Sequence, residues 1–89
     1  MEKRVGRITH YFDHVGAAAV ALDGPLCVGD RIHVTGHTTD LMMTVDRMQI
    51  EHGDVQEAKP GDDVAVQMAG RVREHDEVLK VVADDAGAP

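Results

Sequence analysis

The chain has 89 residues, of which 43% are apolar and 28% are charged, and its formal net charge at pH 7 is −7. A chain of this length forms one domain with a modest core, to which only Tyr11 and Phe12 can contribute aromatic rings. The acidic balance argues against nucleic-acid binding through a broad basic face, because affinity for phosphates depends on Lys and Arg. Cys27 is the single cysteine, which excludes an intramolecular disulfide.

The N-terminal residues lead into an alternating run that lacks the apolar region of a signal peptide. Every apolar stretch of the sequence is shorter than a membrane span. These features predict a cytoplasmic protein that has no membrane partner.

Short alternating runs follow one another along the chain. The first, residues 5–12, places four residues on one face of an expected strand: Gly6, Ile8, His10 and Phe12. The second, residues 15–22, is rich in alanine, which suits a helix by propensity. Because this run is short and lies between turn signals, we predict a strand whose small side chains allow close approach of a neighbouring strand or sheet.

A Gly-Asp corner is repeated along the sequence. Gly29-Asp30 precedes an alternating run within residues 26–36, which predicts a turn that leads into a half-buried strand. The corner returns at Gly61-Asp62, in a segment that fits a type II turn. A third copy, His75-Asp76, has histidine in the glycine position. Since histidine is enriched among non-glycine residues at positive φ, we expect His75 to take that backbone conformation.

Residues 38–52 fit two interpretations. Leu41, Val45 and Met48 have helical spacing, whereas a pair of strands with a bulge near Asp46-Arg47 also fits the pattern. The all-β context on both sides favours the strands. A corner at Gly53-Asp54 and strands over residues 55–58, 64–68 and 77–82 complete the pattern.

Turn signals at intervals of about 8–12 residues, with short alternating runs between them, describe an all-β sandwich or barrel. We predict an all-β fold, a small closed antiparallel β-barrel of roughly six or seven strands. The barrel domain is expected over residues 1–82, followed by a flexible C-terminal tail over residues 83–89.

Three segments carry a resemblance to a known family: Leu26-x-Val28-Gly29-Asp30-x-Ile32-x-Val34-x-Gly36, Val45-x-x-Met48-Gln49-Ile50 and Ala58-x-Pro60-Gly61-Asp62-x-Val64-Ala65-Val66. Over residues 5–82 the chain resembles the second domain of translational GTPases such as elongation factor Tu, which is a closed antiparallel β-barrel. Residues 9–12, 36–40 and 48–52 are similar to small stand-alone translation-factor-like proteins and to the C-terminal barrel of collagenase-like peptidases. The resemblance implies the barrel and supplies no catalytic centre. A phosphate-binding loop is absent from the sequence, so GTP is not expected as a ligand.

The candidate interaction surface lies in the less regular segments and consists of His10, Tyr11, Phe12, His37, Thr38, Thr39, Asp40, Gln49, Glu51 and His52. These residues can also serve simply as turns and strand starts. Arg71 and Arg73 are the candidate RNA contacts. The chain has no serine, and Cys27 fits a buried small hydrophobic residue, so no catalytic residue is expected.

Six histidines raise the question of a metal site. His10 and His14 are four residues apart, as are His33 and His37, and four residues of strand span roughly 13 Å. Zinc needs each ligand nitrogen within about 2.1 Å, so a site requires either that the intervening turn folds one of these pairs together or that the ligands come from different loops. His10, His37 and His52 could converge in the second way if the first hairpin, the Gly36 turn and the strand end at Gly53 share one rim. We favour scattered surface histidines, and we expect no cofactor.

The sequence therefore predicts a non-enzymatic binding module whose partner is a protein. The second-domain barrels of translation factors contact tRNA ends, so an RNA- or tRNA-contacting accessory of translation is the first alternative. The acidic charge ranks it second. A small metal- or ligand-binding protein is the third interpretation.

Overall fold

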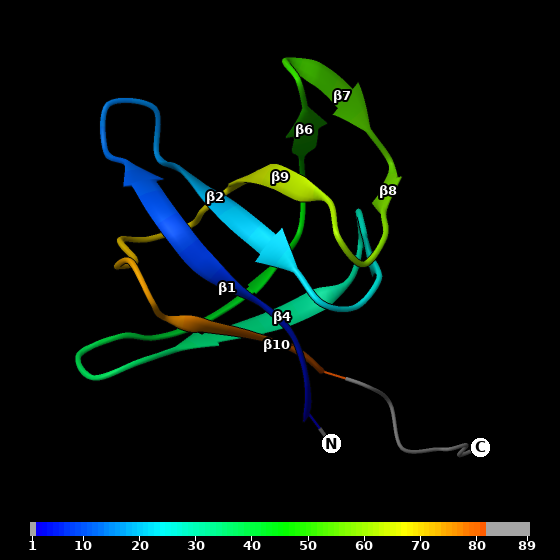
Figure 1. Ribbon diagram of the computed structural model, residues 1–89. Coiled ribbons are helices and arrows are strands. Elements are labelled where there is room, and N and C mark those ends of the chain that lie inside the picture. Colours follow the sequence, from blue (N-terminus) through cyan, green and yellow to red (C-terminus); the bar gives the residue numbers. More distant parts are fainter. Residues whose placement is uncertain (1, 82–89) are drawn as a thin grey trace.

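The computed structural model describes residues 2–81, which form ten strands and no helix (Figure 1). The strands are β1 (Glu2–Phe12), β2 (Ala17–Leu22), β3 (Leu26–Cys27), β4 (Arg31–Thr35), β5 (Asp40–Thr44), β6 (Met48–Ile50), β7 (Gly53–Val55), β8 (Glu57–Ala58), β9 (Asp63–Gln67) and β10 (Glu77–Val81). The all-β prediction is confirmed. The strands outnumber the six or seven expected because β3, β7 and β8, with two or three residues each, are too short to give a sequence pattern. The predicted tail, residues 83–89, lies outside the described residues.

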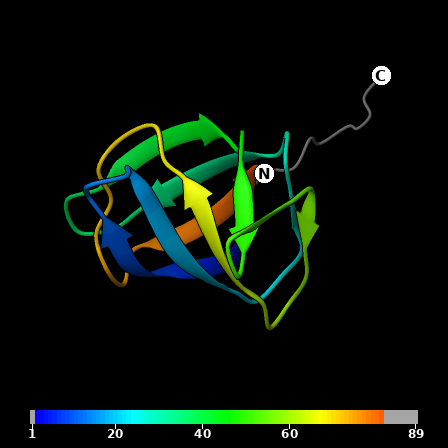
Figure 2. The same ribbon diagram turned by 90° about the horizontal axis from the view of Figure 1, so that it is seen from above.

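Eight strands form one antiparallel sheet in the order β5-β4-β10-β1-β2-β9-β6-β7, and β3 pairs with β8 in a second, small sheet. Within residues 2–81, the end strands β5 and β7 share no ladder. Residues 45–47 alone join β5, at one end of the large sheet, to β6 beside the other end. Because this connection can span at most about 14 Å, the sheet must roll up on itself, as the view along its interior shows (Figure 2). In the residues that the structure describes, no helix is long and apolar enough to span a membrane.

Aliphatic side chains fill the interior of the rolled sheet. In β2, Ala18, Val20 and Leu22 are buried while the alternate positions face outward, which confirms the predicted strand and its phase. The other fully buried large side chains include Ile8, Leu26, Ile32, Met48, Val64, Val66, Val72 and Val78.

A β-bulge changes which residues of β1 face the core. Its register against β2 shifts between Ile8 and His10, which leaves Thr9 as the extra residue. Ile8 is fully buried, Tyr11 packs partly against the core, and His10 and Phe12 are exposed. The prediction that Ile8, His10 and Phe12 share one face is therefore wrong, because the bulge reverses the alternation after Ile8.

The corners at Gly29-Asp30, Gly61-Asp62 and His75-Asp76 share one construction. The residue before each aspartate has positive φ, namely 99° at Gly29, 93° at Gly61 and 75° at His75. Each aspartate carboxylate accepts a hydrogen bond from the backbone N–H three residues earlier, at 2.8 Å for Asp30, 3.0 Å for Asp62 and 2.8 Å for Asp76. The expectation that His75 replaces glycine for backbone reasons is confirmed.

Residues 38–52 contain two strands, β5 and β6, so the strand interpretation is confirmed and the helix is excluded. The expected bulge is wrong, because β5 pairs with β4 whereas β6 pairs with β7 and β9. Residues 45–47 connect them, and their backbone bonds to the Gly29-Asp30 corner and to Gln67. The corner lies at Glu51-His52, where φ is 51° and 68°, and not at Gly53-Asp54, which begins β7.

Candidate interaction groove

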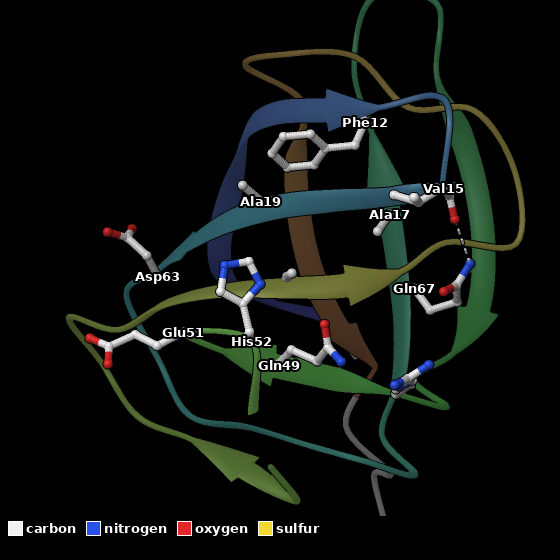
Figure 3. A pocket seen from close by; sticks show the side chains of 11 residues that line it. Phe12, Val15, Ala17, Ala19, Gln49, Glu51, His52, Asp63 and Gln67 are labelled. Carbon is white, nitrogen blue, oxygen red and sulfur yellow. Dashed lines mark hydrogen bonds between the residues drawn. The ribbon is translucent and has the colours of Figure 1, made fainter. Parts of the chain in front are cut away.

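The outer surface of β2, β9 and β6 carries a groove of about 590 Å³ (Figure 3). It exists because these adjacent strands send their large aliphatic side chains inward and leave mostly short ones on the outer face. The lining residues are Phe12, Val15, Ala17, Ala19, Arg47, Gln49, Glu51, His52, Asp63, Ala65 and Gln67.

Two alanines form the floor at the centre of the groove. Ala19 in β2 lies opposite Ala65 in β9, and Ala65 lies opposite Gln49 in β6. On the other side, Ala19 is paired with His10 of β1. Since alanine ends in a methyl group, this row is low in the middle and high at both sides.

The apolar side of the groove is formed by Phe12 and Val15, which are 44% and 65% exposed. His10 packs edge-on against Phe12, with 4.4 Å between the ring centroids, and its Nδ1 lies 3.1 Å from a carboxylate oxygen of Glu74. The Gln67 amide donates to the carbonyl of Val15 at 3.3 Å and to that of the next residue at 3.1 Å. Gln67 thus holds the β1–β2 turn against β9.

The opposite side of the groove is polar, and its groups are bonded to one another. Asp54 accepts hydrogen bonds from the side-chain amide of Gln49 at 2.9 Å and from Nε of Arg47 at 3.1 Å. These two bonds, first that of Gln49, hold the pKa of Asp54 below its usual value. Arg47 and Gln49 are therefore occupied by contacts within the chain.

The turn between β6 and β7 supplies two further lining residues. Glu51 and His52 are the two loop residues between the paired Ile50 and Gly53, and both have positive φ. Two consecutive left-handed residues define a type I′ hairpin turn, which usually contains Asn-Gly. In Figure 3 the His52 ring lies across the groove from Phe12.

Two carboxylates of the lining have no cationic partner in the described part of the chain, Glu51 in the turn and Asp63 at the start of β9. Arg47, the one arginine or lysine of the lining, is already paired with Asp54. The groove therefore combines an apolar floor with a surplus of negative charge.

The structure divides the predicted interaction surface. Phe12, Gln49, Glu51 and His52 line the groove, and His10 flanks it. Tyr11 is half-buried against the core.

His37, Thr38, Thr39 and Asp40 lie at the far end of the β4–β5 hairpin and do not line the groove. His37 and Thr38 are exposed, but Thr39 is 7% exposed. The placement of Thr39 on a surface is therefore wrong, because the hairpin end folds its side chain inward.

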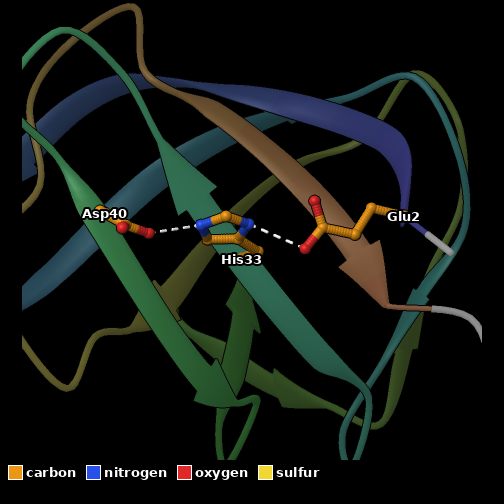
Figure 4. Close-up of polar contacts among 3 residues, drawn as sticks. All are labelled: Glu2, His33 and Asp40. Carbon is orange, nitrogen blue, oxygen red and sulfur yellow. Dashed lines mark hydrogen bonds and ion pairs between the residues drawn. The ribbon is translucent and has the colours of Figure 1, made fainter.

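Asp40 belongs to a second polar cluster, which the sequence did not indicate (Figure 4). The two ring nitrogens of His33 in β4 contact Asp40 of β5 and Glu2 of β1, the latter at 2.8 Å. The hydrogen bond to Asp40, helped by that to Glu2 and opposed by burial, raises the pKa of His33.

Arg71 and Arg73 are exposed on the connection between β9 and β10, on either side of buried Val72, and they are not part of the groove. Cys27 is half-buried and lines a smaller hollow, so the expectation of a buried cysteine is wrong. Within residues 2–81, no three His, Cys, Asp or Glu side chains are arranged to hold a metal ion.

The lining residues that were not predicted are Val15, Ala17, Ala19, Arg47, Asp63, Ala65 and Gln67. A signal for the alanines exists in the sequence, since outward strand positions usually carry polar side chains whereas three of these carry alanine. Their meeting across β2 and β9 depends on strand pairing, which the sequence pattern does not reveal.

The chain matches no protein-family profile. Over 75 residues it is 39% identical to an uncharacterized protease of Methanocaldococcus jannaschii, and this stretch is 83% of the chain and 18% of that protein. The chain thus spans about a fifth of the length of the curated relative that it matches.

Among solved structures, the chain is similar to the C-terminal domain of a U32 peptidase of Geobacillus thermoleovorans, with a TM-score of 0.83, 17% identity, and coverage of 90% of this chain and 93% of that one. It is also similar to the bacterial selenocysteine-specific elongation factor EF-Sec, with a TM-score of 0.69, 19% identity, and coverage of 86% of this chain and 14% of that one. Both resemblances expected from the sequence, to a translation factor and to a peptidase C-terminal domain, are therefore confirmed at the level of the fold.

Proposed function

We propose that this chain is a non-enzymatic β-barrel module that binds a protein through the groove on β2, β9 and β6. The observation that carries the proposal is the exposure of Phe12 and Val15 beside a floor of alanine methyl groups. Apolar side chains that stand exposed around a hollow form the type of surface that partners cover. Because Gln49 and Gln67 already bond within the chain, the groove offers contact area more than free reactive groups.

The relatives support a binding role. The matched stretch is 18% of the Methanocaldococcus jannaschii protease, and the matched part is 14% of EF-Sec. In both proteins this fold is one portion of a much longer chain, and an accessory module that contributes contacts fits that arrangement. Closure of the sheet into a complete barrel belongs to the same proposal, supported by the short connection between β5 and β6. A cytoplasmic location also remains a prediction.

Photo-cross-linking tests the groove directly. A benzophenone amino acid placed at Phe12 should form an adduct with a protein of the source cell, and Ala19→Arg, which fills the floor, should abolish that adduct. The same group at Met42 is a matched control, since Phe12 and Met42 are both 44% exposed and Met42 lies outside the groove. Equal adducts from both positions, or an adduct that persists in Ala19→Arg, would contradict the proposal.

RNA contact is the second candidate, supported by the fold shared with EF-Sec and by the exposed Arg71 and Arg73. Binding to RNA through phosphates weakens steeply with salt. Retention on an RNA column that is lost at moderate salt and in Arg71→Ala/Arg73→Ala would favour this candidate. If neither the wild type nor the double arginine variant is retained on the column, RNA contact is excluded.

A further inference from the structure

We propose that the groove recognises a partner segment that combines an apolar side chain with a lysine or arginine. This inference deepens the proposed function and rests on it. It commits to the chemistry of the partner, a basic and apolar peptide segment, on the basis of three features of the groove.

The first feature is the shape of the apolar floor. In the sheet, β1 and β6 are separated by β2 and β9, so about 14 Å lie between them at the usual strand spacing. Across that width the floor consists of Ala19 and Ala65, and Phe12 stands at the β1 side. An apolar side chain seated on the two methyl groups would be covered by the Phe12 ring, which removes apolar area of both partners from water.

The second feature is the charge of the lining. Glu51 and Asp63 lie on the same side of the groove (Figure 3), and neither pairs with a cation among residues 2–81. A lysine or arginine that entered beside the apolar floor would meet two carboxylates. A phosphate group at the same place would be repelled, and the net charge of −7 adds to this preference.

The third feature is the turn that presents Glu51. Glu51 and His52 hold φ of 51° and 68°, a conformation that asparagine and glycine adopt at lower cost. Unfavourable backbone conformations tend to be kept where the side chains they present are used. Both side chains of this turn line the groove, so the turn presents a carboxylate at its rim.

Titration of the isotope-labelled chain with short blocked peptides, followed by NMR, tests the inference. The probes are a peptide of alternating leucine and lysine, a neutral one with glutamine in place of lysine, and an acidic one with glutamate. The basic peptide should shift the methyl signals of Ala19 and Ala65 and bind about tenfold more tightly than the neutral peptide, as expected for two charge contacts. Glu51→Gln/Asp63→Asn should remove that advantage and leave the affinity for the neutral peptide unchanged.

The control variant, Glu57→Gln/Glu77→Gln, also removes two negative charges, but at exposed positions outside the lining. It should bind the basic peptide as tightly as the wild type does. Equal affinity for the basic and neutral peptides at the groove would overturn the inference while the proposed function stands. NMR shifts located outside the groove, or no shifts at all, would also overturn the inference. An equal loss of affinity for the basic peptide in the control variant would overturn it as well, and so would tighter binding of an oligouridine RNA at the groove. The proposed function fails separately, by the cross-linking experiment at Phe12.

Discussion

A single left-handed residue shapes each of three corners of the molecule. In two corners this residue is glycine, and in the third it is His75, with φ of 75°. A side chain in this conformation costs about 1–2 kcal/mol, because Cβ approaches the following carbonyl oxygen. The aspartate after it stabilises each corner by accepting a backbone hydrogen bond, and Asp76 does so while almost fully buried.

His75→Gly should therefore raise the free energy of unfolding by about 0.5–1 kcal/mol, since relief of the left-handed conformation exceeds the added entropy of the unfolded chain. Urea unfolding measures this change. His14→Gly, in the turn after β1 where φ is not positive, is the matched control and should lose stability by about 0.5–1 kcal/mol. Equal destabilisation of both variants would show that His75 is not strained.

Gly36 meets the side chain of Asp76, since a Cβ built on Gly36 would overlap the Asp76 carboxylate. Gly36→Ala should lower the free energy of unfolding by about 1–3 kcal/mol, because the buried carboxylate must move to make room. Gly53→Ala, where the nearest atom to the added Cβ is 3.5 Å away, should change it by less than about 1 kcal/mol. Thermal unfolding of the two variants checks this prediction. A Gly36→Ala protein as stable as Gly53→Ala would contradict it.

At the scale of elements, the sequence predicts what depends on neighbours in the chain. The strand β2, the corners at Gly29-Asp30 and Gly61-Asp62 and the role of His75 follow from local alternation and from backbone preferences, and these predictions are confirmed. The bulge at Thr9 is set by the register of β1 against β2, and the short strand β3 exists because Leu26 pairs with Ala58 of β8. Their side chains give no local signal, because the pairing decides where the phase changes.

The groove is likewise only partly predictable from the sequence. Phe12, Gln49 and Glu51 are among the predicted interaction residues because the alternation of the sequence is less regular there and their side chains are polar or aromatic. Its floor was missed, since Ala19 and Ala65 are 46 positions apart in the sequence, from residue 19 to residue 65, and meet only by pairing of β2 with β9. Alanine at an outward strand position also suits simple packing, so its presence alone does not reveal a groove.

The β6–β7 hairpin provides a test in which stability and binding change in opposite directions. Glu51→Asn/His52→Gly installs the usual type I′ sequence and should raise the free energy of unfolding by about 1–2 kcal/mol. It also removes the Glu51 carboxylate, so affinity for the leucine–lysine peptide should fall. Glu51→Gln is the control, which loses the carboxylate and keeps the backbone cost. A double variant that is no more stable than Glu51→Gln would show that the turn carries no strain.

At the scale of the whole molecule, the cluster around His33 joins three strands of the rolled sheet. Glu2 belongs to β1, His33 to β4 and Asp40 to β5, and in the sheet order these strands lie on both sides of β10. The protonated ring can bond to both carboxylates at once, whereas a neutral ring can donate to one of them. Protonation of His33 therefore ties one end strand of the sheet to the N-terminal strand.

The sign of the pH dependence follows from the raised pKa of His33. The folded chain binds this proton more tightly than the unfolded chain does, so the stabilisation is fully present below the unfolded value of 6.5 and is lost as the pH rises through the higher folded value. We expect its size to be less than about 1 kcal/mol, because the carboxylate of Asp40 is exposed. His33→Gln keeps a polar side chain without a titrating proton. Urea unfolding at about pH 5.5 and about pH 8.5, on either side of the usual histidine pKa, gives the free energy of unfolding of the wild type and of His33→Gln. The wild type should exceed His33→Gln by more at the lower pH than at the higher pH. A difference that is equal at both values, or larger at the higher one, would show that the charged ring does not link these strands.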